Sequence, residues 1–137
     1  MKIQAQNGFT TIELIMVIII IGVIAATAVP KFTSMSVVSV GGAAEMIQAD
    51  IRYAQELAMA VYEAKSVTFA SGAGSYTTVD LETRELPSRV TIGNNFTVTF
   101  NPLGEPTAGG GGSVTVSAGG ETGTIRVTNY TGKVSID

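Results

Sequence analysis

Residues 8–30 read GFTTIELIMVIIIIGVIAATAVP, and this stretch is the most apolar part of the chain. Residues 14–29 include no charged side chain, and four consecutive isoleucines lie at residues 18–21. As a helix, residues 9–29 would span roughly 30 Å, which is about the thickness of the hydrocarbon core of a bilayer. The sequence therefore predicts a transmembrane helix over residues 9–30.

Helix-breaking residues end this stretch and interrupt the segment after it. Pro30 lacks a backbone donor and clashes with the preceding turn, so we expect a helix kink there. Gly41 and Gly42 each cost about 1 kcal/mol in a helix interior, which predicts a bend or a locally melted stretch. Apolar residues recur at steps of three and four from Val40 to Val61, so an amphipathic continuation of the helix is expected over residues 31–65.

Beyond residue 65 the chain consists of short runs rich in Val, Thr, Phe and Tyr, separated by Gly, Pro and Asn. This composition is typical of strands, and the alternation of polar and apolar residues in some runs indicates a sheet with one apolar face. The predicted strands are residues 66–70, 76–81, 96–100, 113–116, 124–129 and 133–136. Thr131-Gly132 predicts a tight turn in a final hairpin, and four glycines at residues 109–112 predict a flexible loop.

Together these patterns predict an α+β fold: a long N-terminal hydrophobic and amphipathic helix packed on a small, mainly antiparallel β-sheet. A chain of 137 residues is long enough for one domain with a modest core. The expected organisation is a leader peptide at residues 1–8, the apolar helix at 9–30, its amphipathic continuation at 31–65 and a globular β domain at 66–137.

Composition excludes several classes of function. The chain has no cysteine and no histidine, so thiolate and imidazole chemistry are absent, and we expect neither an enzyme nor a cofactor nor a metal site. Asp80, Glu82 and Glu85 could approach one another around calcium, but a solvated turn is the preferred interpretation because the ligand pattern is incomplete. The net charge is −3 and basic residues are scattered, which disfavours nucleic acid as a partner.

The position of the one plausible cleavage site is unusual. A secretory signal peptide is cut after its apolar stretch, whereas the small residue Gly8 precedes it. Cleavage there would leave the apolar helix on the product. Glu13 would cost about 2.5 to 3.5 kcal/mol on a membrane helix. It therefore needs either a charged partner or, if this is an ordinary signal anchor, a solvated position near the membrane surface.

Gly8, Phe9, Glu13 and Pro30, spaced as they are around a membrane-length apolar run, resemble the class III signal of type IV prepilins and type II secretion pseudopilins. The resemblance implies that a prepilin peptidase cleaves between Gly8 and Phe9 and methylates the new amine of Phe9. It also implies that Glu13 forms a salt bridge with that amine in a neighbouring subunit, which would couple processing to assembly.

Residues 48–60 and the final hairpin at residues 124–134 look like the GspH/FimT group of minor pseudopilins and minor pilins. This implies a structural subunit of a pilus-like filament, held in the bacterial inner membrane by a single pass with its C-terminal domain in the periplasm before assembly. Its implied partners are other pilin or pseudopilin subunits, the prepilin peptidase, and an inner-membrane assembly platform with its ATPase.

Three alternatives stay open at this point. The chain could be a tip subunit that binds DNA or a surface, an abundant major pilin, or a membrane-anchored domain that never polymerises. DNA binding is disfavoured because Arg126 and Lys133 near the final hairpin stand beside Glu121 and Asp137.

Overall fold

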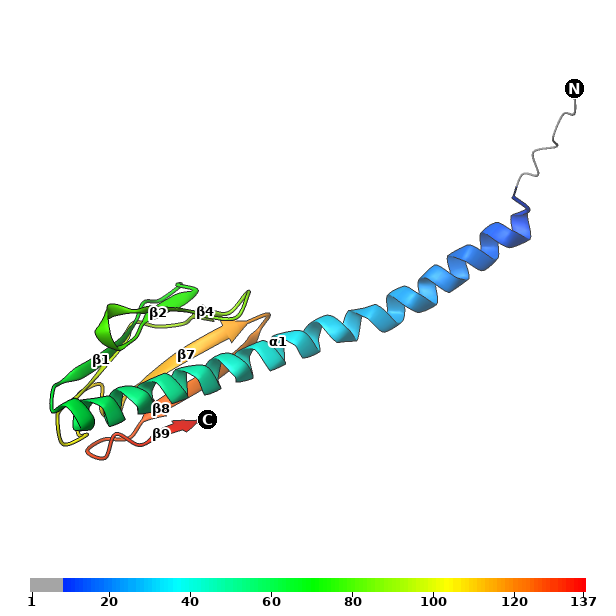
Figure 1. Cartoon of the computed structure of the whole chain (residues 1–137). Coiled ribbons are helices and arrows are strands. Elements are labelled where there is room, and N and C mark those ends of the chain that lie inside the picture. The colour runs from blue at the N-terminus through cyan, green and yellow to red at the C-terminus, as the bar shows by residue number, and fades with distance from the viewer. Residues whose placement is uncertain (1–8) are drawn as a thin grey trace, which may run out of the picture. The chain divides into compact units, whose positions relative to one another are not determined.

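The computed structural model describes residues 9–137, and for residues 27–36 it describes the helical backbone but not the side chains. The chain divides into two compact units, Met1–Ser34 and Met35–Asp137. A helix, α1, runs from Thr11 to Val61 and contributes residues to both units. All the strands that follow α1 along the chain belong to the second unit (Figure 1).

Thr10 determines where α1 begins. Its side-chain oxygen Oγ1 accepts a hydrogen bond from the backbone N–H of Glu13 at 3.3 Å, and its carbonyl oxygen accepts one from the N–H of Leu14 at 3.1 Å. A threonine at this position satisfies a backbone donor that the helix itself leaves unpaired. Glu13 therefore lies in the first turn of the helix.

The second unit contains two antiparallel sheets. The five-stranded sheet has the order β3-β2-β1-β5-β6, and the four-stranded sheet has the order β4-β7-β8-β9. The first comprises β1 (Lys65–Phe69), β2 (Ser75–Thr77), β3 (Thr83–Glu85), β5 (Phe96–Phe100) and β6 (Pro106–Ala108). The second comprises β4 (Thr91–Ile92), β7 (Ser113–Ala118), β8 (Glu121–Val127) and β9 (Val134–Ile136). A short 3-10 helix, η1 (Val79–Leu81), connects β2 to β3.

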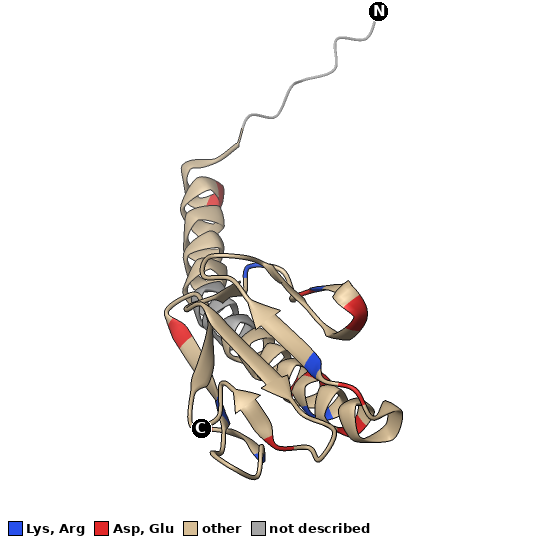
Figure 2. Cartoon of the chain, turned by 90° about the vertical axis from the view of Figure 1, so that its left-hand side faces the viewer, with Lys and Arg blue, Asp and Glu red and all other residues tan. Residues whose placement is uncertain are grey.

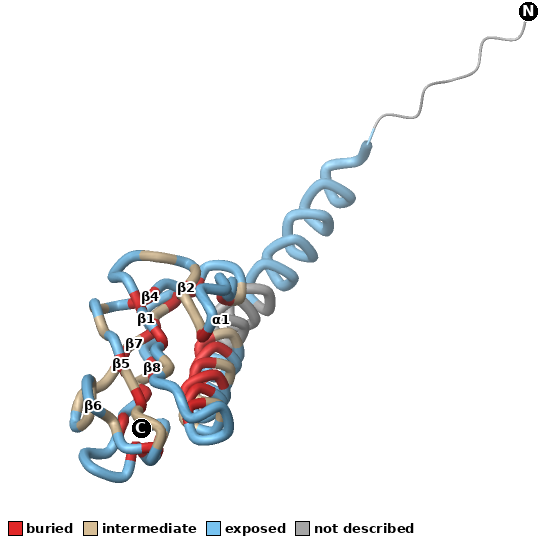
Figure 3. The backbone as a smooth tube through the Cα atoms, turned by 60° about the vertical axis from the view of Figure 1, so that its left-hand side comes forward, coloured by how far each residue is buried: buried red, intermediate tan, exposed pale blue. Residues whose placement is uncertain are grey.

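One face of α1 and the apolar faces of both sheets form the core of the second unit. On α1, Ile47, Ile51 and Ala54 are fully buried, as the spacing of three and four residues predicted. Inward-facing residues alternate along β7, where Val114 and Val116 are completely buried. Figure 3 shows this buried face on the second half of α1. Full burial of a side chain such as Ile stabilises the fold by about 1.5 to 3 kcal/mol.

The predicted fold class was wrong. One long N-terminal helix of pilin type on one small sheet was expected, whereas the strands form two sheets. The side chains of α1 are described over two stretches, of 16 and 25 residues, which belong to different units. The first stretch starts at Thr11, and among the residues of α1 whose side chains are described, those in the core begin at Val40. Three strands, β3, β4 and β6, were missed because two or three residues are too few to show alternation.

The predicted single pass through the bacterial inner membrane, with the C-terminal domain in the periplasm, is also contradicted. Among the described residues, no helix has both the length and the apolar character needed to cross a bilayer.

The final hairpin exists, but its turn differs from the prediction. β8 and β9 pair in antiparallel fashion with Val127 opposite Val134, so residues 128–133 form a longer connection than a tight turn at Thr131-Gly132. The backbone N–H of Gly132 donates to the carbonyl of Thr128 at 3.1 Å, and Thr128 in turn donates to Lys133. These hydrogen bonds join the two ends of the connection to each other.

The glycines at residues 109–112 form a defined turn, not the flexible loop that was predicted. The N–H of Gly111 donates to the carbonyl of Val127 at 2.9 Å, which ties the turn to β8. Gly109 has a positive φ of 77°, and a Cβ built on it would lie 2.5 Å from the carbonyl oxygen of Thr97. Glycine is therefore required at residue 109 by both conformation and space.

Gly109→Ala is expected to lower the free energy of unfolding by about 3 kcal/mol, because it combines a left-handed backbone with an overlap that the sheet cannot relieve. Gly120→Ala is the matched control, since Gly120 also has a positive φ but has open space where a Cβ would lie. Its cost should be about 1 kcal/mol. Urea unfolding followed by circular dichroism would measure both. Equal losses would show that the close approach to Thr97 is unimportant.

Candidate functional site

The predicted cleavage and assembly residues lie at the start of the described chain. Gly8, like the rest of the predicted leader peptide at residues 1–8, lies outside the described residues. Phe9 is 82% exposed, and Glu13 is exposed in the first turn of α1. An acidic side chain in this turn interacts favourably with the partial positive charge of the helix N-terminus. The charge of Glu13 therefore favours the start of the helix locally, in addition to any role in assembly.

The first stretch of α1 is apolar on every side. Its large hydrophobic side chains from Ile12 to Val23 are between 44% and 65% exposed, and Figure 3 shows the exposed tube along this part of the helix. A helix that is hydrophobic all round belongs to the interior of a larger structure. Exposed apolar surface of this extent marks an interaction site. We call residues 9–26 the apolar stretch.

Helix kinks were predicted at Pro30, Gly41 and Gly42. Pro30 falls within residues 27–36, whose side chains lie outside the description, so its kink stays a prediction. Gly41 and Gly42 have helical backbone within α1, so the helix is not melted there. A Cβ built on either glycine would meet nothing within 4 Å. Both glycines therefore leave open space beside the helix.

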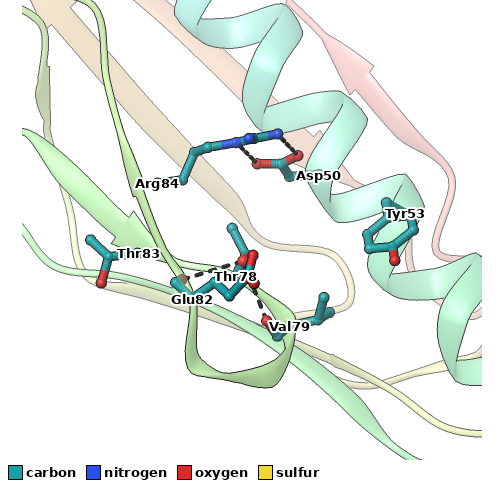
Figure 4. Close-up of a pocket in the computed structure, with 7 residues that line it drawn as sticks. All are labelled: Asp50, Tyr53, Thr78, Val79, Glu82, Thr83 and Arg84. Atoms are coloured by element: carbon teal, nitrogen blue, oxygen red, sulfur yellow. Dashed lines mark hydrogen bonds and ion pairs between the residues drawn. The ribbon is translucent and has the colours of Figure 1, made fainter.

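A buried polar cluster joins α1 to the β2–β3 hairpin (Figure 4). Arg84 donates to both carboxylate oxygens of Asp50, from Nε to Oδ2 and from Nη2 to Oδ1, each at 3.1 Å. The hydroxyl of Tyr76 donates to Oδ2 of Asp50 at 2.6 Å. Asp50 is only 9% exposed and Tyr76 only 3%. Burial, together with the hydrogen bond to Asp50, raises the pKa of Tyr76, which keeps its hydroxyl protonated as a donor.

Sequence reasoning missed this cluster, although a signal was present. Asp50 lies three residues after Ile47 and four before Ala54, on the apolar stripe of α1. An acid in the middle of such a stripe must be paired, because burying an isolated charge is costly. The partner could not be identified from sequence, since Arg84 lies in a short exposed strand without clear alternation.

A small cavity of about 110 Å³ adjoins the cluster and is lined by Asp50, Tyr53, Thr78, Val79, Glu82, Thr83 and Arg84. One of its carboxylates, Asp50, already accepts from three donor groups of two side chains, Tyr76 and Arg84. Of the acids considered for calcium, Asp80 accepts from Nζ of Lys65 at 3.1 Å, and no group of three metal-ligating side chains gathers among the described residues. The cluster is therefore best explained as a tie between helix and sheet.

Three further side chains of α1 donate hydrogen bonds to backbone oxygens of the β domain, in β9, in the β8–β9 connection and in the β5–β6 turn. Gln48 and Arg52 both donate to the carbonyl oxygen of Val134 in β9, at 3.1 and 3.0 Å. Gln55 donates to the carbonyls of Gly104 and Thr131, at 2.7 and 2.9 Å. Polar side chains of α1 thus bind backbone oxygens of the β domain.

The basic residues near the last hairpin do not form a cluster that would suit DNA. Nε of Arg126 donates to Oδ2 of Asp137 at 3.0 Å, so its charge is partly neutralised. Figure 2 shows acidic and basic positions interspersed over the second unit. A phosphate-binding surface would need several basic side chains gathered on one face.

Comparisons with known proteins give no match: no family model, no curated protein and no solved structure is similar to the chain.

Proposed function

We propose that this chain is a structural subunit of a type IV pilus-like filament, namely a minor pseudopilin of a type II secretion system or a minor type IV pilin. The observation that carries the proposal is the apolar stretch, whose side chains are exposed on all sides directly after the Gly8–Phe9 junction. Its partners are other subunits of the same kind, a prepilin peptidase that cuts after Gly8, and an assembly ATPase.

Burial of the apolar stretch supplies the driving force for assembly. Each square ångström of apolar surface removed from water contributes about 25 cal/mol. Packing several such helices side by side covers every face at once, which one globular domain with its own closed core could not do. A role as scaffold, without catalysis, fits a chain whose buried acid is already paired.

Charge pairing gives the assembly its register. Glu13 is the single charged side chain in the apolar stretch, and inside a bundle of apolar helices it needs a cation. Cleavage after Gly8 would create the amine of Phe9 on every subunit. Because an unpaired charge in a dry interior is strongly destabilising, only neighbours that place this amine beside Glu13 would fit.

The proposal predicts that subunits in filaments begin at Phe9 and carry one added methyl group on the new amine. Intact-mass measurement of sheared filaments would test this. Gly8→Leu should leave residues 1–8 attached and keep the chain out of filaments, whereas Asn7→Ala, one residue away, should be processed normally. Working filaments whose subunits still begin with Met1 would contradict the proposal.

A further inference from the structure

A groove of about 220 Å³ opens on the second unit between α1 and the edge of the four-stranded sheet where β8 begins and β9 ends. Its floor is formed by the buried residues Val40 and Ala44 of α1 and Gly123 of β8. Val37 of α1 and Ile136 of β9 line it with exposed apolar side chains. The groove is therefore apolar but accessible, which is typical of a docking site for a hydrophobic segment.

We propose that this groove receives the apolar stretch of a second copy of the chain. The inference deepens the proposed function and rests on it, because the filament is what brings two copies together. The apolar stretch has the matching chemistry: its side chains are hydrophobic and exposed.

The charges of the two partners are complementary. Glu121 and Asp137 also line the groove, and both are exposed. Asp137 is paired with Arg126, whereas Glu121 has no ion pair among the described residues, so the groove is net negative. In the sequence of the cleaved chain, the apolar stretch would be flanked by the amine of Phe9 and by Lys31, with Glu13 as the only acid. Over residues 9–31 these charges sum to one positive charge, which Lys31 supplies from just beyond the apolar stretch.

Gly41 keeps the groove open because it has no side chain. It lines the groove, and a Cβ built on it would meet nothing within 4 Å. Gly42 is its neighbour on α1 and is equally open, but it does not line the groove. A side chain at residue 41 would fill the space that the second copy needs, whereas one at residue 42 would not. The two glycines are therefore a matched pair for testing the groove.

Gly41→Leu is expected to reduce the amount of the full chain in sheared filaments roughly tenfold, equivalent to about 1.4 kcal/mol, whereas Gly42→Leu should change it less than about twofold. Both substitutions replace glycine by a better helix former in open space, so neither should unfold the chain. Thermal unfolding of both variants would verify this. Equal yields for the two variants would overturn the inference.

Cysteine cross-linking would identify the occupant directly, since the chain has no cysteine of its own. One tagged copy would carry Ile136→Cys in the groove, and a second, differently tagged copy Ile15→Cys in the apolar stretch. Oxidation of filaments should link the two tags, and Tyr62→Cys, exposed but outside the groove, should not link to Ile15→Cys.

The outcomes separate the inference from the proposed function. If filaments form and Ile15→Cys links only to itself in other copies, the inference is overturned and the filament stands. A link between both cysteines placed in a single copy, or a link from Ile136→Cys to a different protein, would also overturn it. If the unsubstituted chain enters no filament, the proposed function fails, and the inference fails with it.

Discussion

Replacing Glu13 by Ala is expected to reduce incorporation of the chain into filaments at least about a hundredfold. The variant would leave the amine of Phe9 without a partner in a bundle of apolar helices, and removal of one member of a buried ion pair costs about 3 to 5 kcal/mol. The second unit contains its own core and should stay folded. Filament yield by quantitative immunoblot and thermal unfolding of the same variant would measure the two effects separately.

Glu13→Gln tests whether residue 13 acts through its negative charge or through its position in the first turn of α1. Thr10 caps α1 by accepting from the N–H of Glu13, and the pattern Thr-x-x-Glu is that of a capping box, in which Gln can replace Glu. If the carboxylate is needed for its charge, the Gln variant should fail to assemble as severely as the Ala variant. If its role is capping alone, Gln should restore assembly, which would contradict the proposed ion pair.

Glu45→Gln is the control for loss of one negative charge. Glu45 is exposed on α1 but lies outside the apolar stretch, so its substitution should leave filament yield unchanged. A loss equal to that of Glu13→Gln would show that overall charge matters and that the position of Glu13 does not.

The helical part of the fold could be predicted from sequence because its signal is local. Spacing of three and four residues correctly identified the buried side of α1 from Val40 to Ala58, while Val61 at the helix end is 45% exposed. Strand β5 was predicted with its observed bounds for a similar reason, since polar and apolar residues alternate over Phe96–Phe100.

The division into two sheets could not be predicted, because it depends on pairings between strands far apart in the chain. β1 pairs with β5, across the β2–β3 hairpin and β4, and the two-residue β4 joins β7 of the other sheet. The sequence within each of these short strands does not indicate which other strand it pairs with. The glycine turn at residues 109–112 was misjudged likewise, since the carbonyl that excludes a side chain there belongs to Thr97.

The N-terminal candidate site was predicted from sequence, whereas the groove was not. Gly8, Phe9 and Glu13 lie close together in the sequence, so their spacing alone forms a motif that can be recognised. The groove instead combines residues near Gly41 with Gly123 and Ile136, which only folding brings together.

Asp50→Ala is expected to cause the largest loss of stability among single truncations of polar side chains of α1, about 2 to 3 kcal/mol. The substitution leaves the hydroxyl of Tyr76 buried without its acceptor, and an unsatisfied buried polar group costs about 1 to 3 kcal/mol. The guanidinium of Arg84 is half exposed and can return to water, so we assign the loss mainly to Tyr76. Urea unfolding of the full chain would measure it.

Asp137→Ala is the matched control, because both carboxylates accept from an arginine Nε at 3.0 to 3.1 Å and differ mainly in burial. The side chains of Asp137 and Arg126 are each 52% exposed, so the loss should stay below about 1 kcal/mol. A loss as large as that of Asp50→Ala would show that burial is not what makes the Asp50 cluster stabilising.

The double variant Asp50→Ala/Tyr76→Phe tests the assigned cause. If the unpaired hydroxyl of Tyr76 accounts for the loss, removing this hydroxyl as well should recover part of the stability. The double variant should then be less destabilised than the sum of the two single variants. Strict additivity would mean that Tyr76 finds another partner when Asp50 is absent. The cost of Asp50→Ala would then come from the lost link between α1 and Arg84 on β3, which Arg84→Ala would reproduce.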